Sequence, residues 1–131
     1  MATFTAGELE VMQVLWDHGA LNPAQIEERF PRPIQNAALR SVLLVLMEKG
    51  HVTREKVGRS YVYAARTPRQ NTFKNMVRRL SDVFCGGSPA ALIAQIIKTE
   101  KLSKEDIAEL RRVMSQAEEP AADTRKKGKR S

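Results

Sequence analysis

The sequence predicts a mainly α-helical protein with a small β-hairpin: an N-terminal winged helix-turn-helix followed by a C-terminal helical dimerisation region. Three amphipathic helical patterns precede residue 50, a Val- and Tyr-rich hairpin pattern covers residues 51–65, and only helical patterns follow residue 68. We therefore expect a winged-helix DNA-binding domain at residues 1–68, a helical dimerisation domain at 69–117 and a disordered basic tail at 118–131. A generic small α+β domain is the alternative for the first part.

The first two helices are predicted from their caps. Thr5, with Glu8 three residues later, has the pattern of a capping box, and apolar residues at helical spacing follow. Asn22 before Pro23 marks the start of a second, short helix. Two prolines soon after residue 30 end this helix and give the short irregular link that a helix-turn-helix needs.

The third helix, at residues 36–49, is the predicted groove reader. Leu39, Val42, Leu43 and Leu46 form an apolar stripe toward the core, and Gly50 is placed to end the helix. Recognition helices present their N-terminal residues to base edges. The expected reading edge is therefore Asn36, Ala37, Arg40 and Ser41. Arg40 is the first choice for a base contact, to guanine O6 and N7, and a phosphate contact is its alternative.

The hairpin turns at Gly58 and Arg59, and basic residues gather on it. Such side chains suit phosphate or minor-groove contacts, which position a protein on DNA without reading much sequence. The expected contacts are Arg54, Lys56 and Arg59, with Tyr61 as a further phosphate ligand. A packing role is expected for at least one of Tyr61 and Tyr63.

After residue 68 the sequence predicts three short amphipathic helices. Isolated helices of this length are marginal in water, so we expect their apolar faces to pack against a second copy of the chain. Folding back onto the winged helix of the same chain is the alternative. The expected dimer contacts are Phe73, Val77, Leu80, Ile93, Ile97, Ile107, Leu110 and Met114.

Composition gives weaker evidence. The net charge is +7, but residues 120–131 carry five basic side chains against one acidic, a net of +4, which leaves +3 for the rest of the 131-residue chain. The N-terminus lacks a signal-peptide pattern. No apolar run reaches the ~18 residues of a membrane span, so we expect a cytoplasmic protein without membrane insertion.

The sequence holds no constellation of catalytic residues. Cys85 is the single cysteine, so neither an intramolecular disulfide nor a Cys-rich metal cluster can form, and a buried or inert thiol is expected rather than a redox role. His18 and His51 each lie near a helix end without a carboxylate or Cys partner in sequence, and both are expected to be surface or capping residues. We therefore expect no enzyme, no cofactor and no metal.

Several segments together resemble a known family. They are residues 4–16, with Glu8, Met12 and Trp16 at four-residue spacing, residues 39–52, and the wing sequence Gly-Arg-Ser-Tyr-Val-Tyr at 58–63. From about residue 4 to residue 114 the chain is similar to the penicillinase repressors, bacterial winged-helix repressors of β-lactamase and related genes. The resemblance implies a homodimer that binds the half-sites of a two-fold operator and blocks promoters.

The resemblance also implies a mode of release. In the family, a membrane sensor with a metalloprotease domain can trigger cleavage within the dimerisation helices. The matching bond here is Gln95–Ile96, where the best-known members have Asn-Phe, and we favour a dimer-core role for Ile96. Positions 37 and 38 are Ala here, where those members have Lys and Thr, so the operator is expected to differ.

Two functions from different classes remain open. The first is a sequence-specific repressor that acts as a homodimer on a palindromic operator of double-stranded DNA. The second is a winged-helix protein-interaction module with only non-specific DNA affinity, for which binding falls steeply with salt and shows no sequence preference.

Overall fold

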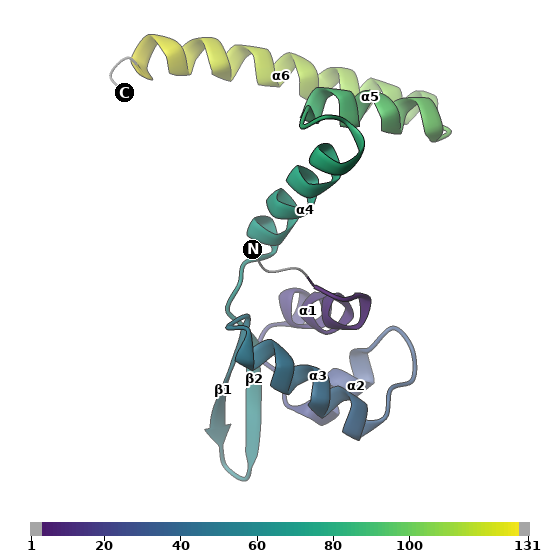
Figure 1. Ribbon diagram of the computed structural model, residues 1–131. Helices are drawn as coiled ribbons and strands as arrows, with labels where there is room; N and C mark the ends of the chain where they lie inside the picture. Colours follow the sequence, from purple (N-terminus) through teal and green to yellow (C-terminus); the bar gives the residue numbers. More distant parts are fainter. Residues whose placement is uncertain (1–3, 129–131) are drawn as a thin grey trace. The chain divides into compact units, whose positions relative to one another are not determined.

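A computed structural model describes residues 4–128, and the side chains of residues 4–118. It confirms the predicted mainly helical fold with a two-stranded hairpin and an N-terminal winged helix, and the dimerisation role of the C-terminal helices stays a prediction. The chain forms two compact units, Met1–Val77 and Arg78–Ser131, which separate within a helix. The domain bounds expected from the sequence stay predictions. Along the chain the elements are α1 (Ala6–His18), α2 (Pro23–Arg29), α3 (Asn36–Glu48), β1 (Val52–Val57), β2 (Ser60–Ala65), α4 (Arg69–Phe84), α5 (Pro89–Thr99) and α6 (Lys104–Gly128) (Figure 1).

The predicted caps are present. The Glu8 amide donates to Thr5 Oγ1 at 3.1 Å and the Thr5 amide donates to Glu8 Oε1 at 3.0 Å, which completes the capping box of α1. Asn22 and Gln25 make the same reciprocal pair at the start of α2, at 2.9 Å for both bonds. The unbonded first-turn amides of these helices thus gain acceptors from side chains close in sequence.

The core of the first unit joins all three of its first helices to the hairpin. α3 contributes Leu39, Leu43 and Leu46, each buried, while Val42 beside them is only partly buried. Burial of each such side chain is worth about 1.5–3 kcal/mol, which fixes which face of α3 points inward. The other buried apolar residues of this core are Val11, Met12, Val14, Leu15, Leu21, Ile26, Phe30, Val52 and Tyr63.

The hairpin pairs β1 with β2 in antiparallel register, from Val52 opposite Ala65 to Val57 opposite Ser60. Gly58 in the turn has φ +63°, a conformation that glycine adopts without steric cost. At the other end, Leu21 and Tyr63 exchange backbone hydrogen bonds of 3.0 and 2.7 Å, which tie the hairpin to the segment between α1 and α2.

His51 differs from the prediction. It is buried, whereas a surface or capping position was expected. Its Nδ1 hydrogen-bonds with Thr67 Oγ1 at 2.6 Å, and the Phe4 ring lies 4.5 Å from the imidazole centroid to centroid. The N-terminal segment before α1 therefore covers the point where the chain leaves α3, a contact between residues 47 positions apart that local sequence does not encode.

The second unit contains the last two helices, and α5 has no buried residue. Ser88 caps α5, and Ser103 and Asp106 form a reciprocal pair at the start of α6. The α6 backbone is helical to Gly128, where the sequence predicts a disordered tail from residue 118; residues 129–131 lie outside the described part. Within the described residues no single helix is long and apolar enough to cross a bilayer. α4 and α5 meet that criterion only as a pair, bent by 81° at the break between them.

Candidate nucleic-acid interface

The outward face of α3 carries the predicted reading edge. Asn36, Ala37, Arg40 and Ser41 are all exposed, whereas Leu39, Leu43 and Leu46 of the same helix are buried. The core packing therefore decides which residues of α3 are available to a ligand. A major groove about 12 Å wide admits an α-helix presented in this way.

The first turn of α3 has no side-chain cap within the described chain. Gln35 occupies the N-cap position without a side-chain hydrogen bond to the helix, and no acidic residue lies in the first turn. Helix N-termini carry a partial positive charge and unpaired amides that suit phosphate oxygens. The start of α3 thus differs from the capped starts of α1 and α2 and is compatible with an approaching phosphate.

Polar side chains at the start of α3 bond to one another. Asn36 Nδ2 donates to Glu27 Oε2, on α2, at 2.7 Å. Arg40 Nε donates to Asn36 Oδ1, also at 2.7 Å. Two of the predicted readers are therefore joined, and an acidic residue absent from the prediction is joined to them.

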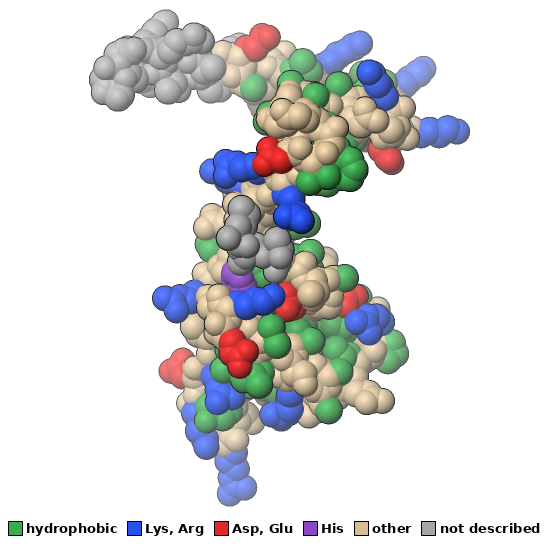
Figure 2. All heavy atoms as spheres, viewed as in Figure 1, with side chains coloured by type: hydrophobic (Ala, Val, Ile, Leu, Met, Phe, Trp, Pro, Cys, Tyr) green, Lys and Arg blue, Asp and Glu red, His purple; other side chains and the backbone are tan. Residues whose placement is uncertain are grey.

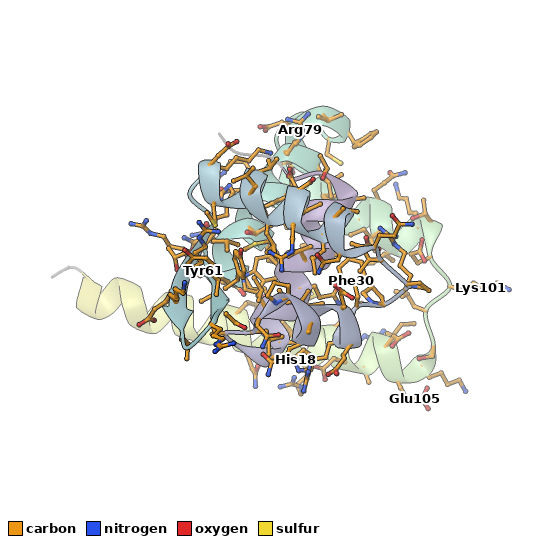
Figure 3. All side chains as sticks on the ribbon, turned by 90° about the horizontal axis from the view of Figure 1, so that it is seen from below. His18, Phe30, Tyr61, Arg79, Lys101 and Glu105 are labelled. Carbon is orange, nitrogen blue, oxygen red and sulfur yellow. The ribbon has the colours of Figure 1, made fainter. Side chains whose placement is uncertain are left out.

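The hairpin presents the predicted basic group, and Figure 2 shows Lys and Arg side chains gathered over it. Arg54, Lys56 and Arg59 are all exposed. The Arg54 guanidinium lies 3.9 Å from the centroid of the Tyr61 ring, and Lys56 Nζ lies 5.7 Å from the same centroid. Tyr61, labelled on the hairpin in Figure 3, is thus a platform that holds two cations in place.

Tyr63 has a different role from Tyr61. Its ring is buried in the core, so it has the packing role expected for one of the two tyrosines. Arg54 Nη1 donates to the Tyr63 hydroxyl at 3.4 Å, and this bond raises the pKa of Arg54 above its ordinary value. The core and the wing therefore share a tyrosine that helps to orient a surface arginine.

An ion pair holds the far end of α3 to α1. Lys49 Nζ lies 3.1 and 3.2 Å from the two carboxylate oxygens of Glu8, which is buried. Burial opposes ionisation of Glu8, but the hydrogen bonds from the Thr5 amide and Lys49 outweigh it and lower the pKa below 4.5. Because Lys49 directly follows α3, this pair helps to set the position of the reading helix.

Three residues of this surface, Leu44, Val45 and Glu27, were not predicted. Leu44 and Val45 are 53% and 37% exposed on α3, although both are apolar. The spacing of Leu44 from Ala37 and Arg40, seven and four residues, could have placed it on the exposed face. No sequence pattern connects Glu27 with Asn36, because the link between α2 and α3 is irregular.

The described residues offer no metal centre. They contain no group of three or more His, Cys, Asp or Glu side chains able to hold a metal ion. Cys85 is partly exposed and lies in the turn after α4.

Three helices followed by a basic two-stranded hairpin, with the outer face of the third helix free, define a winged-helix transcriptional regulator. The model of the penicillinase repressor family matches residues 4–116. The chain belongs to the penicillinase repressor family, a family of DNA-binding winged-helix transcriptional repressors, which confirms the family that the sequence motifs indicated. These are not enzymes, as the sequence predicts.

Two relatives in sequence are consistent with this assignment. The chain is 24% identical over 111 residues to a penicillinase repressor of Bacillus licheniformis, covering 83% of this chain and 87% of that protein. It is 27% identical over 113 residues to an uncharacterised 16.5 kDa protein of Latilactobacillus sakei, covering 85% and 77%.

Among solved structures, the chain is similar to the multiple antibiotic resistance repressor MarR, with 17% identity, a TM-score of 0.46 and coverage of 75% of this chain and 78% of that chain. It is also similar to the YusO protein of Bacillus subtilis, with 18% identity, a TM-score of 0.49 and coverage of 88% and 74%. The family assignment depends on the family model and the sequence relatives alone.

Proposed function

We propose that this protein is a sequence-specific repressor that acts as a homodimer on a palindromic DNA operator. The observation that carries the proposal is the exposed edge of α3, beside a hairpin of oriented cations. In this proposal α3 lies in the major groove with Asn36, Ala37, Arg40 and Ser41 toward the bases. Arg54, Lys56, Arg59 and Tyr61 contact the backbone or the minor groove.

The proposed dimer is supported by apolar surface that the described residues leave exposed. Ile93, Ile97 and Met114 are 55%, 47% and 65% exposed, and the other predicted contacts are also exposed or only partly buried. An open groove of about 450 Å³ lies within the second unit, lined by Ile97, Glu100, Leu102, Ile107, Leu110, Arg111 and Met114. Contiguous apolar surface of this kind is typical of protein–protein interfaces, and a two-fold operator supplies the reason for a second copy.

Proteolytic derepression through a membrane sensor protease is the release mode that the family resemblance implies. The matching residues, Gln95 and Ile96, are exposed on α5. Their peptide lies inside the helix, and the Gln95 carbonyl accepts a hydrogen bond from Thr99 Oγ1 at 2.9 Å. A protease needs extended backbone, so cleavage here requires α5 to unfold first. Ile96, 48% exposed and three residues from the exposed Ile93, is proposed as a dimer-core residue instead.

A protein-interaction module is the second candidate, because Leu44 and Val45 place apolar surface on the outer face of α3. The interaction-module hypothesis predicts that the affinity for DNA falls as salt rises and does not depend on the base sequence. The repressor predicts instead that these side chains contact apolar parts of the groove, such as thymine methyl groups.

Selection of bound sequences from a random DNA pool separates the two. We expect an inverted repeat, with each mismatched base pair costing about 1–3 kcal/mol. Arg40→Ala is expected to relax the preference at one position of each half-site. Arg112→Ala, which removes the same charge from α6, is the matched control. A pool without enrichment would overturn the proposed function.

A further inference from the structure

Glu27 lies where a DNA-binding surface has reason to avoid acidic groups. It is on α2, only partly exposed, and its Oε2 accepts the 2.7 Å bond from Asn36 at the start of the reading helix. A carboxylate beside DNA repels phosphates, and that repulsion extends over roughly 8–10 Å at ordinary salt. Its presence here therefore suggests a specific role.

Hydrogen bonds to Glu27 and Arg40 limit how the Asn36 side chain can contact a base. Its Oδ1 accepts from Arg40 Nε, and one hydrogen of its Nδ2 is donated to Glu27. The bidentate contact of Asn with adenine uses the amide oxygen and an amide hydrogen together. One lone pair of the oxygen and one hydrogen of the amide nitrogen are already used, so Glu27 and Arg40 fix the plane of the Asn36 amide.

The same bonds leave Arg40 with a defined set of donors. Its Nε is engaged by Asn36, so the two terminal nitrogens, Nη1 and Nη2, remain for a ligand. The guanidinium is planar and presents this pair in a rigid fork. Such a fork matches the O6 and N7 acceptors that guanine offers in the major groove.

We infer that Glu27 is a positioning residue for base reading: it fixes the amide of Asn36, Asn36 fixes the guanidinium of Arg40, and Arg40 thereby reads a guanine in each half-site. The inference rests on the proposed function and deepens it, since it adds Glu27 and Asn36 as residues that position the guanidinium expected to contact guanine. We call these two hydrogen bonds, from Asn36 to Glu27 and from Arg40 to Asn36, the relay. Each involves a charged group, and such bonds are shorter and stronger than neutral ones.

The test measures the affinity of the full-length protein for the selected operator and for versions substituted at each half-site position. Replacing the guanine opposite Arg40 is expected to weaken wild-type binding about 5- to 150-fold, and Arg40→Ala abolishes this preference. Glu27→Ala and Asn36→Ala are each expected to reduce the preference at that same position about two- to tenfold. Glu27→Gln retains an acceptor for Asn36 and is expected to keep the preference.

Glu28→Ala is the matched control, because it removes the same charge from the next position of the same helix, where Glu28 pairs only loosely with Arg29 at 3.6 Å. It is expected to raise affinity for all DNA and to leave base preference unchanged. Thermal unfolding of each variant checks that the fold is intact.

The outcomes separate the two proposals. If the wild type discriminates sequence but Asn36→Ala or Glu27→Ala leaves the guanine preference unchanged, the relay is wrong and the repressor function stands. A uniform loss of affinity in Arg40→Ala makes that residue a phosphate contact and also overturns the relay alone. Only a wild type without any sequence preference overturns both.

Discussion

Substitution of Glu8 by Gln tests how firmly the reading helix is attached to α1. The amide keeps an oxygen for the Thr5 amide, so the capping box is retained, but the charge that pairs with Lys49 is lost. A buried hydrogen bond to a charged group is worth about 1.5–3 kcal/mol. Lys49 is 37% exposed, and solvent screening reduces its contribution. We expect a loss of about 1 kcal/mol, or about 4–8 °C in the melting temperature of a unit this size.

The pH dependence of this loss identifies its cause. The folded-state pKa of Glu8 is lowered, so its carboxylate stabilises the fold above 4.5, and this contribution is lost as pH falls through the folded-state value. Protonated Glu8 and the amide are both neutral, so wild type and variant should converge once the pH falls below the lowered folded-state pKa of Glu8.

Thermal unfolding followed by circular dichroism, at fixed chain concentration, measures both quantities. Glu10→Gln is the control, because Glu10 also pairs with an arginine, Arg32, but on the surface, and little change is expected. Equal melting of wild type and Glu8→Gln at neutral pH would refute the reasoning. A difference that persists undiminished in acid would also refute it.

Two further predictions concern packing. Leu43→Ala should cost about 2–5 kcal/mol in urea unfolding, because Leu43 is 1% exposed, whereas Leu44→Ala, one residue along the same helix, should change stability by less than about 0.5 kcal/mol. If Leu44→Ala cost more stability than Leu43→Ala, the assignment of the buried and exposed faces of α3 would be wrong. Leu110→Asp should give monomers in sedimentation, since a charge in an apolar interface is costly, while Gln116→Asp on the same helix should leave the dimer intact. A persisting dimer of Leu110→Asp would contradict the role of α6.

Features that depend on neighbours in sequence were predictable. The caps at Thr5 and Asn22 involve partners three residues away, and the buried leucines of α3 follow from helical spacing. The basic hairpin turn was predictable from Gly58, whose φ of +63° suits a residue without a side chain.

Features that depend on distant neighbours were not predictable. His51 is buried because Phe4 lies against it, and no residue near His51 in the sequence predicts that contact. The Glu27–Asn36 bond crosses a link whose path is not regular, so its two ends could not be paired by spacing. The first unit extends past residue 68 into α4. Trp16 Nε1 donates to the Thr67 carbonyl at 2.8 Å, and Arg69 pairs with Asp17, both contacts across more than 50 residues.

The hydrogen bonds of Glu27 and Glu8 explain why net charge was a poor guide to DNA binding. Acidic residues of the first unit lower its net charge, yet two of them hold α3: Glu27 bonds at its start and Glu8 bonds to Lys49 just beyond its end. In the proposed repressor, α3 is held at both ends, and the fixed positions of Arg40 and its neighbours supply specificity. The hairpin supplies the attraction to phosphate, so the exposed edge of α3 needs few charges of its own. The same carboxylates that weaken the electrostatic signal in the sequence are therefore, in the proposed repressor, part of what makes its DNA binding selective.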